Sequence, residues 1–472
     1  MKIIPITPVD GGPGGGPSQG LYASESKVYP RSVSGLFQRW RWAFVWLTQI
    51  VFYGLPWLQW GERQAVLFDL GARRFYIFGY VLYPQDFIYL TGLLVISALS
   101  LFLFTAVAGR LWCGFSCPQT VYTEIFLWIE RKVEGDRGAR MRLDARRLDL
   151  QKFSRKGLKH LLWGAVALWT GFTFVGYFTP VTQLGSEVLQ GRMGSWEIFW
   201  VFFYGFATYG NAGFMREQVC KYMCPYARFQ SAMFDRDTLI VSYDPGRGEP
   251  RGSRGRKADP KALNLGSCVD CTMCVQVCPT GIDIRDGLQY ECIGCGACID
   301  ACDTVMDKMN YARGLIRFST QNAMASGGGR DAILQRVLRP RVLVYSSILL
   351  VLTAAVMVSL AMRTPLKVDV VRDRAALSRI VAGGMLENVY RLQIMNASEE
   401  KQRYRLDATG LPGLSLASER EFEVGPAESR WVAVRLQIPY GSAAAGSHPI
   451  QFQIDNGGDA HVREKSVFLV PR

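Results

Sequence analysis

Two runs of cysteine constrain this chain more than any other feature of its sequence. Both have the spacing Cys-x-x-Cys-x-x-Cys-x-x-x-Cys, and they lie back to back between residues 268 and 302. Four thiolates at this spacing are the ligand pattern of proteins with two 4Fe–4S clusters. Zinc sites use two separated cysteine pairs with a longer spacer, so these closely spaced thiols suit clusters better. We therefore expect two 4Fe–4S clusters and a protein that moves electrons.

The spacing also predicts which thiols share a cluster, because the fourth cysteine of each run ligates the other cluster. The ligands expected for the first cluster are Cys268, Cys271, Cys274 and Cys302. Those expected for the second are Cys278, Cys292, Cys295 and Cys298.

The rest of the sequence has the composition pattern of a membrane protein. Hydrophobic residues make up 49% of the chain, and they collect in long blocks that alternate with basic segments. The net charge of +14 is explained by Lys and Arg at the cytoplasmic ends of spanning helices, without nucleic acid. We expect five spanning helices, over about 42–58, 87–108, 161–178, 196–214 and 342–362.

The distribution of charge predicts how these helices are oriented. Basic segments follow the second and fourth helices, whereas the loops after the first and third carry few positive charges. The N-terminus and residues 268–302 should then lie in the cytoplasm, and the C-terminal tail in the periplasm. All 12 cysteines precede that tail, which agrees with an oxidising compartment for it. A multi-pass protein of the bacterial inner membrane is expected.

Changes in composition divide the chain into expected domains. Gly and Pro near the start predict a disordered arm, and the basic stretch before the cysteine runs predicts a flexible linker. The expected order is a disordered arm over 1–38, a four-helix transmembrane region over 39–233, a basic linker over 234–260, an α+β ferredoxin domain over 261–320, a fifth transmembrane helix over 340–363 and a β-rich domain over 364–472.

The β-rich domain shows short strands of alternating apolar and polar residues separated by turn clusters. Residues 388–396, 430–438 and 450–454 have this alternation. Such strands at regular spacing over about 110 residues predict an immunoglobulin-like β-sandwich. We expect His448 and His461 to be ordinary surface histidines, and the domain offers no catalytic constellation.

A second set of cysteines lies at the membrane edge. Cys113-x-x-x-Cys117-Pro follows the second helix, and Cys220-x-x-x-Cys224-Pro follows the fourth, which indicates an internal duplication. Each proline disfavours helix for the cysteine before it and so exposes that sulfur at a helix end. The four thiolates could hold Cu(I), with Met223 as a thioether ligand. They could instead act as a redox dithiol pair or ligate a further cluster.

Other titratable residues near these motifs are expected to be ordinary. Glu124 and Glu130 follow the first motif and are read as solvated carboxylates rather than proton carriers. His160 opens the third helix and is read as interfacial. Helices two to four offer it no second histidine, so no haem is expected.

These motifs, and the order in which they occur, resemble those of a known protein family. The stretches Trp112–Thr120 and Tyr222–Gln230, the double cysteine run, one further helix and a β-rich tail resemble the cytochrome c oxidase accessory protein family, CcoG/FixG/RdxA, of membrane-bound polyferredoxins. The resemblance implies a cupric oxidoreductase activity that reduces Cu(II) to Cu(I) in the cytoplasm for assembly of a cbb-type oxidase. Copper would be a substrate or transient ligand at Cys113, Cys117, Cys220 and Cys224.

The resemblance also implies partners. A copper chaperone or copper-transporting ATPase would receive Cu(I), the tail would contact oxidase subunits, and the cytoplasmic electron donor stays unidentified.

Two other functions compete with this one. Quinol-linked polyferredoxins of nitrate and nitrous-oxide respiration resemble the chain in their Cys-x-x-x-Cys-Pro pairs and ferredoxin runs. The absence of a periplasmic cofactor-binding motif in this sequence weighs against that function. An assembly scaffold that docks through the β-sandwich is the other alternative.

Overall fold

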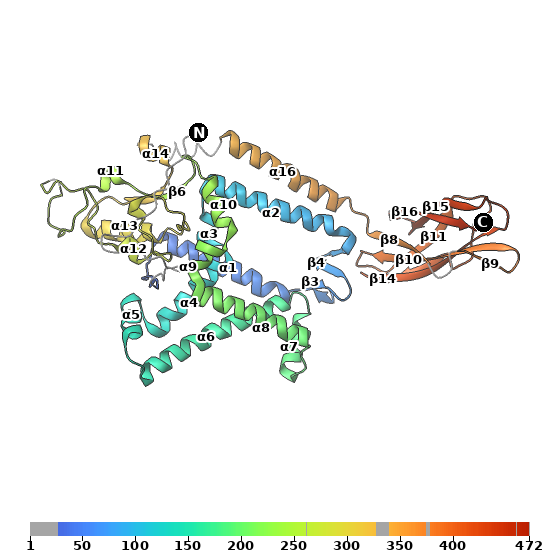
Figure 1. The fold of residues 1–472 in the computed structure, drawn as a ribbon, viewed down its shortest axis with the longest axis horizontal. Helices are drawn as coiled ribbons and strands as arrows, with labels where there is room; N and C mark the ends of the chain where they lie inside the picture. The colour runs from blue at the N-terminus through green and yellow to red at the C-terminus, as the bar shows by residue number, and fades with distance from the viewer. Residues whose placement is uncertain (1–26, 261, 327–338, 374–377, 459, 472) are drawn as a thin grey trace, which may run out of the picture.

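The computed structural model describes residues 27–260, 262–326, 339–373, 378–458 and 460–471. The first 26 residues of the expected disordered arm lie outside these ranges. The cysteine-rich region lies at one end of the molecule, long helices occupy the middle, and a β-sandwich lies at the other end (Figure 1). The ferredoxin region and the cysteine-free tail are therefore separated by the length of the helices.

All five segments expected to span the membrane form helices. They are α1 (Leu36–Gly54), α2 (Phe87–Ala108), α6 (Leu150–Val175), α8 (Ser195–Gly210) and α16 (Pro340–Ala361). Within the described residues, three helical segments are long and apolar enough to cross a membrane, at 84–108, 150–175 and 340–361. Helix α8 has 16 residues, fewer than the ~20 of an ordinary span, and a π-helical turn over Asn211–Met215 continues it. Helix α1 carries Arg39 and Arg41 in its first two turns. The chain is a membrane protein.

Close helix packing in this region depends on glycine. A Cβ on Gly171 of α6 would lie 2.1 Å from the carbonyl oxygen of Val201 on α8, and Gly205 faces the same crossing. Small residues allow membrane helices to approach to backbone contact. Helices α2 and α16 run side by side (Figure 1), and the Tyr89 hydroxyl donates to the Ser359 carbonyl at 3.1 Å.

Helix α4 (Pro118–Glu134) carries buried carboxylates, so the expectation that Glu124 and Glu130 are solvated is wrong. Glu124 pairs with Arg41 of α1 at 2.9 Å. Glu130 pairs with Arg140 and with Arg216, each at 2.7 Å. Each carboxylate is neutralised by cations from other elements, which makes its burial tolerable. These ion pairs tie α4 to α1 and to α5 (Arg137–Ala145).

The segment before α1 is also packed, so the expectation of a disordered arm is wrong for residues 27–38. Asp144 binds the Lys27 ammonium at 3.0 Å and the Tyr29 hydroxyl at 2.7 Å. Asp300 of the ferredoxin region accepts hydrogen bonds from the backbone N–H groups of Phe37 and Gln38 at 3.2 and 2.8 Å. A carboxylate at this position caps the helix N-terminus and fastens α1 to the ferredoxin region.

The ferredoxin region is built from α12 (Met273–Gln276), α13 (Ala297–Met309) and the antiparallel pair β6 (Ile240–Tyr243) and β7 (Ile316–Ser319). Strand β6 lies within the stretch 234–260, so the expectation of a flexible linker there is wrong. Arg254 donates to the carbonyl oxygens of Gly266 at 2.5 Å and Cys268 at 3.3 Å. The basic residues of this stretch thus satisfy backbone groups, and the domain begins near residue 240 rather than 261.

The C-terminal region is the expected immunoglobulin-like β-sandwich. One sheet has the order β12-β14-β10-β8 with β9 on β10, and the other has the order β13-β11-β15-β16. Tyr390 and Phe452 meet edge to face between the sheets at 5.1 Å. The strands are β8 (Leu366–Arg372), β9 (Arg379–Val381), β10 (Met385–Asn396), β11 (Gln402–Thr409), β12 (Ser415–Leu416), β13 (Glu421–Val424), β14 (Ser429–Pro439), β15 (Gly446–Asp455) and β16 (His461–Val470).

A small sheet that the sequence did not predict joins the sandwich to the helices. It consists of β3 (Val66–Asp69), β4 (Arg74–Ile77) and β5 (Tyr80–Leu82). Asp86, at the start of α2, pairs with Arg363 at 2.5 Å, and the Tyr83 hydroxyl donates to the Asn396 carbonyl of β10 at 3.0 Å. These buried contacts anchor the sandwich to the helical region.

The remaining short elements connect these parts of the chain. They are β1 (Gln59–Trp60), β2 (Arg63–Gln64), α3 (Leu111–Phe115), α7 (Val181–Gln190), α9 (Arg216–Gln218), α10 (Pro225–Met233), α11 (Pro245–Gly248) and α14 (Gln321–Ser326).

Candidate iron–sulfur and thiol site

The eight cysteines of the two runs surround two cavities in the ferredoxin region. The first cavity is lined by Cys268, Cys271, Cys274 and Cys302. The second is lined by Cys278, Cys292, Cys295 and Cys298, and Cys274 lines it as well as the first. Each cavity thus gathers one of the crossed ligand sets that the spacing predicts.

The lining of the two cavities fits 4Fe–4S clusters. Four thiols around one space are the ligand set of such a cluster. The fold therefore offers two cavities lined by thiols, four around the first and five around the second.

The first cavity is the one nearer to solvent. Among the 12 cysteines only Cys271, on this cavity, is exposed. Arg285 beside it pairs with Asp283 at 2.6 Å and with Asp270 at 2.5 Å. A soluble electron carrier would therefore reach the first cavity more easily than the second.

The second cavity lies against the membrane-edge motifs. A Cβ on Gly114 would lie 2.9 Å from the Cα of Cys295 and from the carbonyl oxygen of Ile293. Cys113 and Cys220 pack on the apolar cluster that contains these two residues. One thiol from each motif thus contacts the loop that forms the second cavity.

The prolines shape both motifs in the same way. Cys117 precedes Pro118, the first residue of α4, and Cys224 precedes Pro225, the first residue of α10. Both cysteines have extended backbone, with ψ of 129° and 109°, as expected before proline. The Cys117 sulfur also accepts hydrogen bonds from backbone N–H groups at the start of α4.

The four motif thiols lie close enough to interact electrostatically. Cys113 interacts with Cys117 and Cys220, and Cys224 interacts with Cys117 and Cys220. Burial raises the pKa of the Cys113 thiol to about 12 and that of Cys220 to about 11. A metal that binds here as a thiolate complex must therefore displace protons. We call Cys113, Cys117, Cys220 and Cys224 the thiol quartet; Met223 beside it is exposed.

Two buried residues that the sequence did not single out lie beside the quartet, and one of them, Arg110, also reaches the ferredoxin region. Arg110 donates to the carbonyl oxygens of Tyr290, in the ferredoxin region, and Ala227, on α10. The fully buried Gln230 accepts a hydrogen bond from the Cys113 sulfur at 3.4 Å. The sequence offered one signal for Arg110, which is its position directly after a long apolar block. A cation at such a position is buried only where other groups pair with it.

The histidines take no part in this site. His160 Nδ1 lies 2.8 Å from the Tyr209 hydroxyl, and its ring stacks on Phe214 at 6.0 Å. His448 is half-buried and His461 is exposed, both on the sandwich.

Comparison with known families agrees with this geometry. A 4Fe–4S dicluster domain matches residues 215–321, a 4Fe–4S binding domain matches residues 90–134, and the IG-like fold at the C-terminal of FixG matches residues 356–471. The nitrogen fixation protein FixG of Rhizobium meliloti (strain 1021) is 39% identical over 427 residues, which cover 84% of this chain and 82% of that protein. The chain belongs to the FixG/RdxA family.

Other members of the FixG/RdxA family match over similar lengths. Protein RdxB of Cereibacter sphaeroides is 40% identical over 84% of this chain and 85% of its own length. Protein RdxA of the same organism is 37% identical over 93% of this chain and 96% of its own length. The crystal structure of a FixG-related protein from Vibrio parahaemolyticus covers 23% of this chain and 97% of that chain, at 27% identity and a TM-score of 0.21.

The family and its domains establish the general character of the molecule. It is a membrane-bound iron–sulfur electron-transfer protein with an immunoglobulin-like domain. The 4Fe–4S binding match over residues 90–134 covers the first membrane-edge motif, although that range contains only Cys113 and Cys117.

Proposed function

We propose that this protein reduces Cu(II) to Cu(I) in the cytoplasm and supplies Cu(I) for assembly of a cbb-type cytochrome c oxidase. The observation that carries this proposal is the contact between the thiol quartet and the loop of the second cavity, at Gly114 and Cys295. A protein that moves single electrons thus places two soft ligands, Cys113 and Cys220, against the loop of its second cavity.

The ferredoxin region would hold two 4Fe–4S clusters, which supply one-electron transfer when bound. We assign Cys268, Cys271, Cys274 and Cys302 to the first, and Cys278, Cys292, Cys295 and Cys298 to the second. The exposed Cys271 marks the side that a cytoplasmic electron donor would approach.

The thiol quartet would bind copper as substrate through two of its thiols, since within the described residues no three His, Cys, Asp or Glu side chains are placed to hold one metal ion. Thiolate ligands select Cu(I), so a thiol site stabilises the reduced product relative to Cu(II). Binding releases protons from the buried Cys113 and Cys220 thiols, whose pKa values burial raises. Arg110, whose charge acts on both thiols, favours their ionised form. Met223 is exposed beside Cys224 and is available as a thioether ligand.

The membrane topology that we propose has five spans, with α1 and α8 as the shorter ones. The ferredoxin region and the sandwich lie at opposite ends of the helices (Figure 1), and basic segments follow α2 and α8. Both features support a cytoplasmic ferredoxin region and a periplasmic sandwich in the inner membrane. Trypsin added to spheroplasts should cleave the sandwich and spare the ferredoxin region, and the reverse pattern would refute this orientation.

Delivery of copper requires partners on both sides of the membrane. A cytoplasmic copper chaperone or copper-transporting ATPase would take Cu(I) from the quartet. The sandwich would contact oxidase subunits, since its buried anchorage to α2 through Asp86 and Arg363 holds it at a fixed distance from the membrane.

Anaerobic Cu(II) reduction tests the proposed activity. Dithionite-reduced protein, freed of excess dithionite, is mixed with Cu(II), and Cu(I) is measured with a chromogenic chelator. The Cys113→Ser/Cys117→Ser variant should lose most of the reduction, whereas Ser116→Ala, in the same motif, should keep it. Iron and sulfide contents verify that both variants retain their clusters. Undiminished reduction by the double variant with clusters intact would overturn the assignment.

A further inference from the structure

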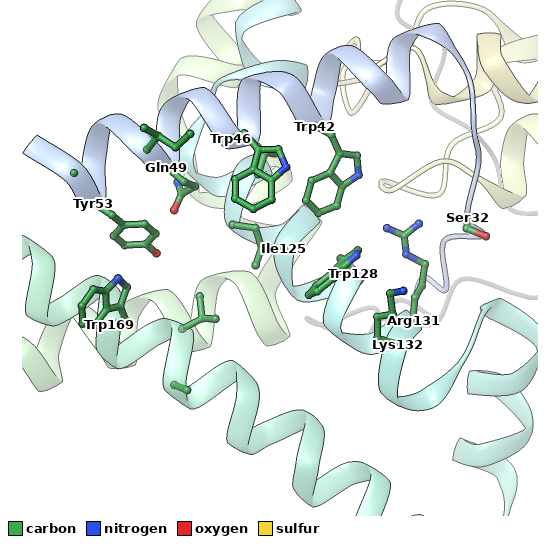
Figure 2. A pocket seen from close by; sticks show the side chains of 15 residues that line it. Ser32, Trp42, Trp46, Gln49, Tyr53, Ile125, Trp128, Arg131, Lys132 and Trp169 are labelled. Carbon is green, nitrogen blue, oxygen red and sulfur yellow. The ribbon is translucent and has the colours of Figure 1, made fainter.

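A long aromatic groove lies between α1, α4 and α6, away from the thiol quartet (Figure 2). Its empty volume is about 2260 Å³, part of it open to the surroundings. Trp42 and Trp46 of α1, Trp128 of α4 and Trp169 of α6 line it, and Arg131 and Lys132 stand at one end.

Polar contacts hold the helices together at the two ends of the groove, and within it Trp42 and Trp128 meet edge to face at 6.3 Å. At one end Arg41 of α1 pairs with Glu124 of α4 at 2.9 Å. At the other the Tyr53 hydroxyl of α1 lies 2.9 Å from the Thr170 hydroxyl of α6. Between these contacts the aromatic side chains stay accessible, and Trp46 is 62% exposed.

The length of the groove matches a lipid chain. It follows α1 from Trp42 to Gly54, which at 1.5 Å per residue is about 18 Å. One leaflet of a bilayer contributes about 15 Å of hydrocarbon. A groove of this length and apolar lining suits an acyl chain that runs parallel to the helices.

The charge of the groove is confined to the end near the ferredoxin region. Lys132 is exposed there, with its ammonium 6.0 Å from the centre of the Trp128 ring. Arg131 lies 3.7 Å from Glu124, a carboxylate that already has Arg41 as a closer partner. An apolar channel with two cations at its mouth is complementary to an anionic headgroup attached to an apolar tail.

We propose that this groove binds one phospholipid with an anionic headgroup. Its phosphate lies on Arg131 and Lys132, and an acyl chain fills the space between α1 and the α4–α6 pair. The lipid braces α1, whose N-terminus is fastened to the ferredoxin region through Asp300. The topology proposed above places the lipid in the cytoplasmic leaflet. The binding of the lipid depends neither on that topology nor on the copper activity.

Native mass spectrometry of the full-length, cluster-loaded protein tests the proposal. The detergent-purified protein is incubated with equal amounts of phosphatidylglycerol and phosphatidylcholine, and the retained lipids are counted. Wild-type protein should retain one phosphatidylglycerol in preference to phosphatidylcholine. The Lys132→Gln variant should lose about fivefold of this preference, the factor expected for one basic side chain near a phosphate. Arg155→Gln, which removes an exposed cation of α6 outside the groove, should leave it unchanged.

A second variant blocks the groove rather than its mouth. Ala165 is an exposed groove residue of α6, and Ala165→Trp should abolish retention while iron content stays at the wild-type level. Leu161→Trp, at an exposed position of α6 outside the groove lining, is the matched control.

Three results would overturn the proposal. They are equal retention of the two phospholipids, retention that Ala165→Trp does not reduce, and a native quinone as the retained molecule. A quinone is the alternative occupant because its reduced form, a quinol, carries a hydroxyl that would donate a hydrogen bond to the buried Gln49 Oε1, which has no hydrogen-bond partner in the groove wall.

Discussion

The contact between Gly114 and the loop of the second cavity gives the sharpest mutational prediction. A Cβ at this position would lie 2.9 Å from three backbone atoms, the Cα of Cys295 and the carbonyl oxygens of Ile293 and Gly294. Ordinary contacts between carbon atoms are about 3.5–4.0 Å. In Gly114→Ala the motif must therefore move away from the loop by roughly 0.6–1 Å, at a cost of about 1–3 kcal/mol for an overpacked site.

The expected result is a protein that keeps its clusters but delivers electrons to copper more slowly. The displacement moves the thiol quartet away from the second cavity without removing a thiol from either site. The assay is stopped-flow formation of Cu(I) from Cu(II) by the reduced protein, with iron content and thermal unfolding measured in parallel.

A matched glycine provides the control for this experiment. A Cβ on Gly164 of α6 would meet nothing within 4 Å, so Gly164→Ala should leave the rate unchanged and stabilise the helix by up to about 1 kcal/mol. If Gly114→Ala reduces Cu(II) at the wild-type rate, the contact is not part of the electron path.

Three further predictions concern charged residues. Glu130→Gln leaves Arg140 and Arg216 without a full counter-charge and should cost about 3–5 kcal/mol; an unchanged thermal unfolding midpoint would contradict this. Burial raises the pKa of Asp144, but hydrogen bonds from Lys156, Tyr29 and Lys27 outweigh this effect and hold that pKa well below its ordinary value. Its contribution is therefore present above about pH 4 and is lost as the pH falls further, so amide protection of residues 27–35 should persist to about pH 4. Asp144→Asn should lose that protection at pH 7, and full protection would refute the role of this carboxylate. Arg110→Gln removes a cation that acts on Cys292 and should lower the potential of the second cluster in an EPR redox titration; an unshifted potential would contradict that.

The parts of this fold that sequence patterns predicted are those with local signals. Cysteine spacing predicted the two thiol sets because the ligands of a cluster must converge on one cavity. Apolar blocks predicted α2 to its end residues, Phe87 and Ala108, because its whole length is uncharged. Alternating strands predicted the sandwich, whose two sheets bury one face of each strand.

The failures come from contacts between distant segments. The basic stretch over 234–260 has the composition of a flexible linker, yet β6 pairs with β7 and Arg254 binds carbonyl groups near Cys268. Glu124 and Glu130 look like surface carboxylates, but their partners Arg41 and Arg216 lie more than 80 residues away. Such pairings depend on how the helices pack, which a single sequence does not encode in any local pattern.

Two clusters in the ferredoxin region and copper at the thiol quartet would give this protein a defined metal content. Anaerobic purification followed by quantitation of iron and copper measures that content. About eight iron atoms per chain are expected, four for each of two clusters. Cu(I) should bind to the wild-type protein and be lost when Cys113, Cys117, Cys220 and Cys224 are changed to Ser. About twelve iron atoms, falling to about eight in that variant, would show instead that the quartet holds a third cluster.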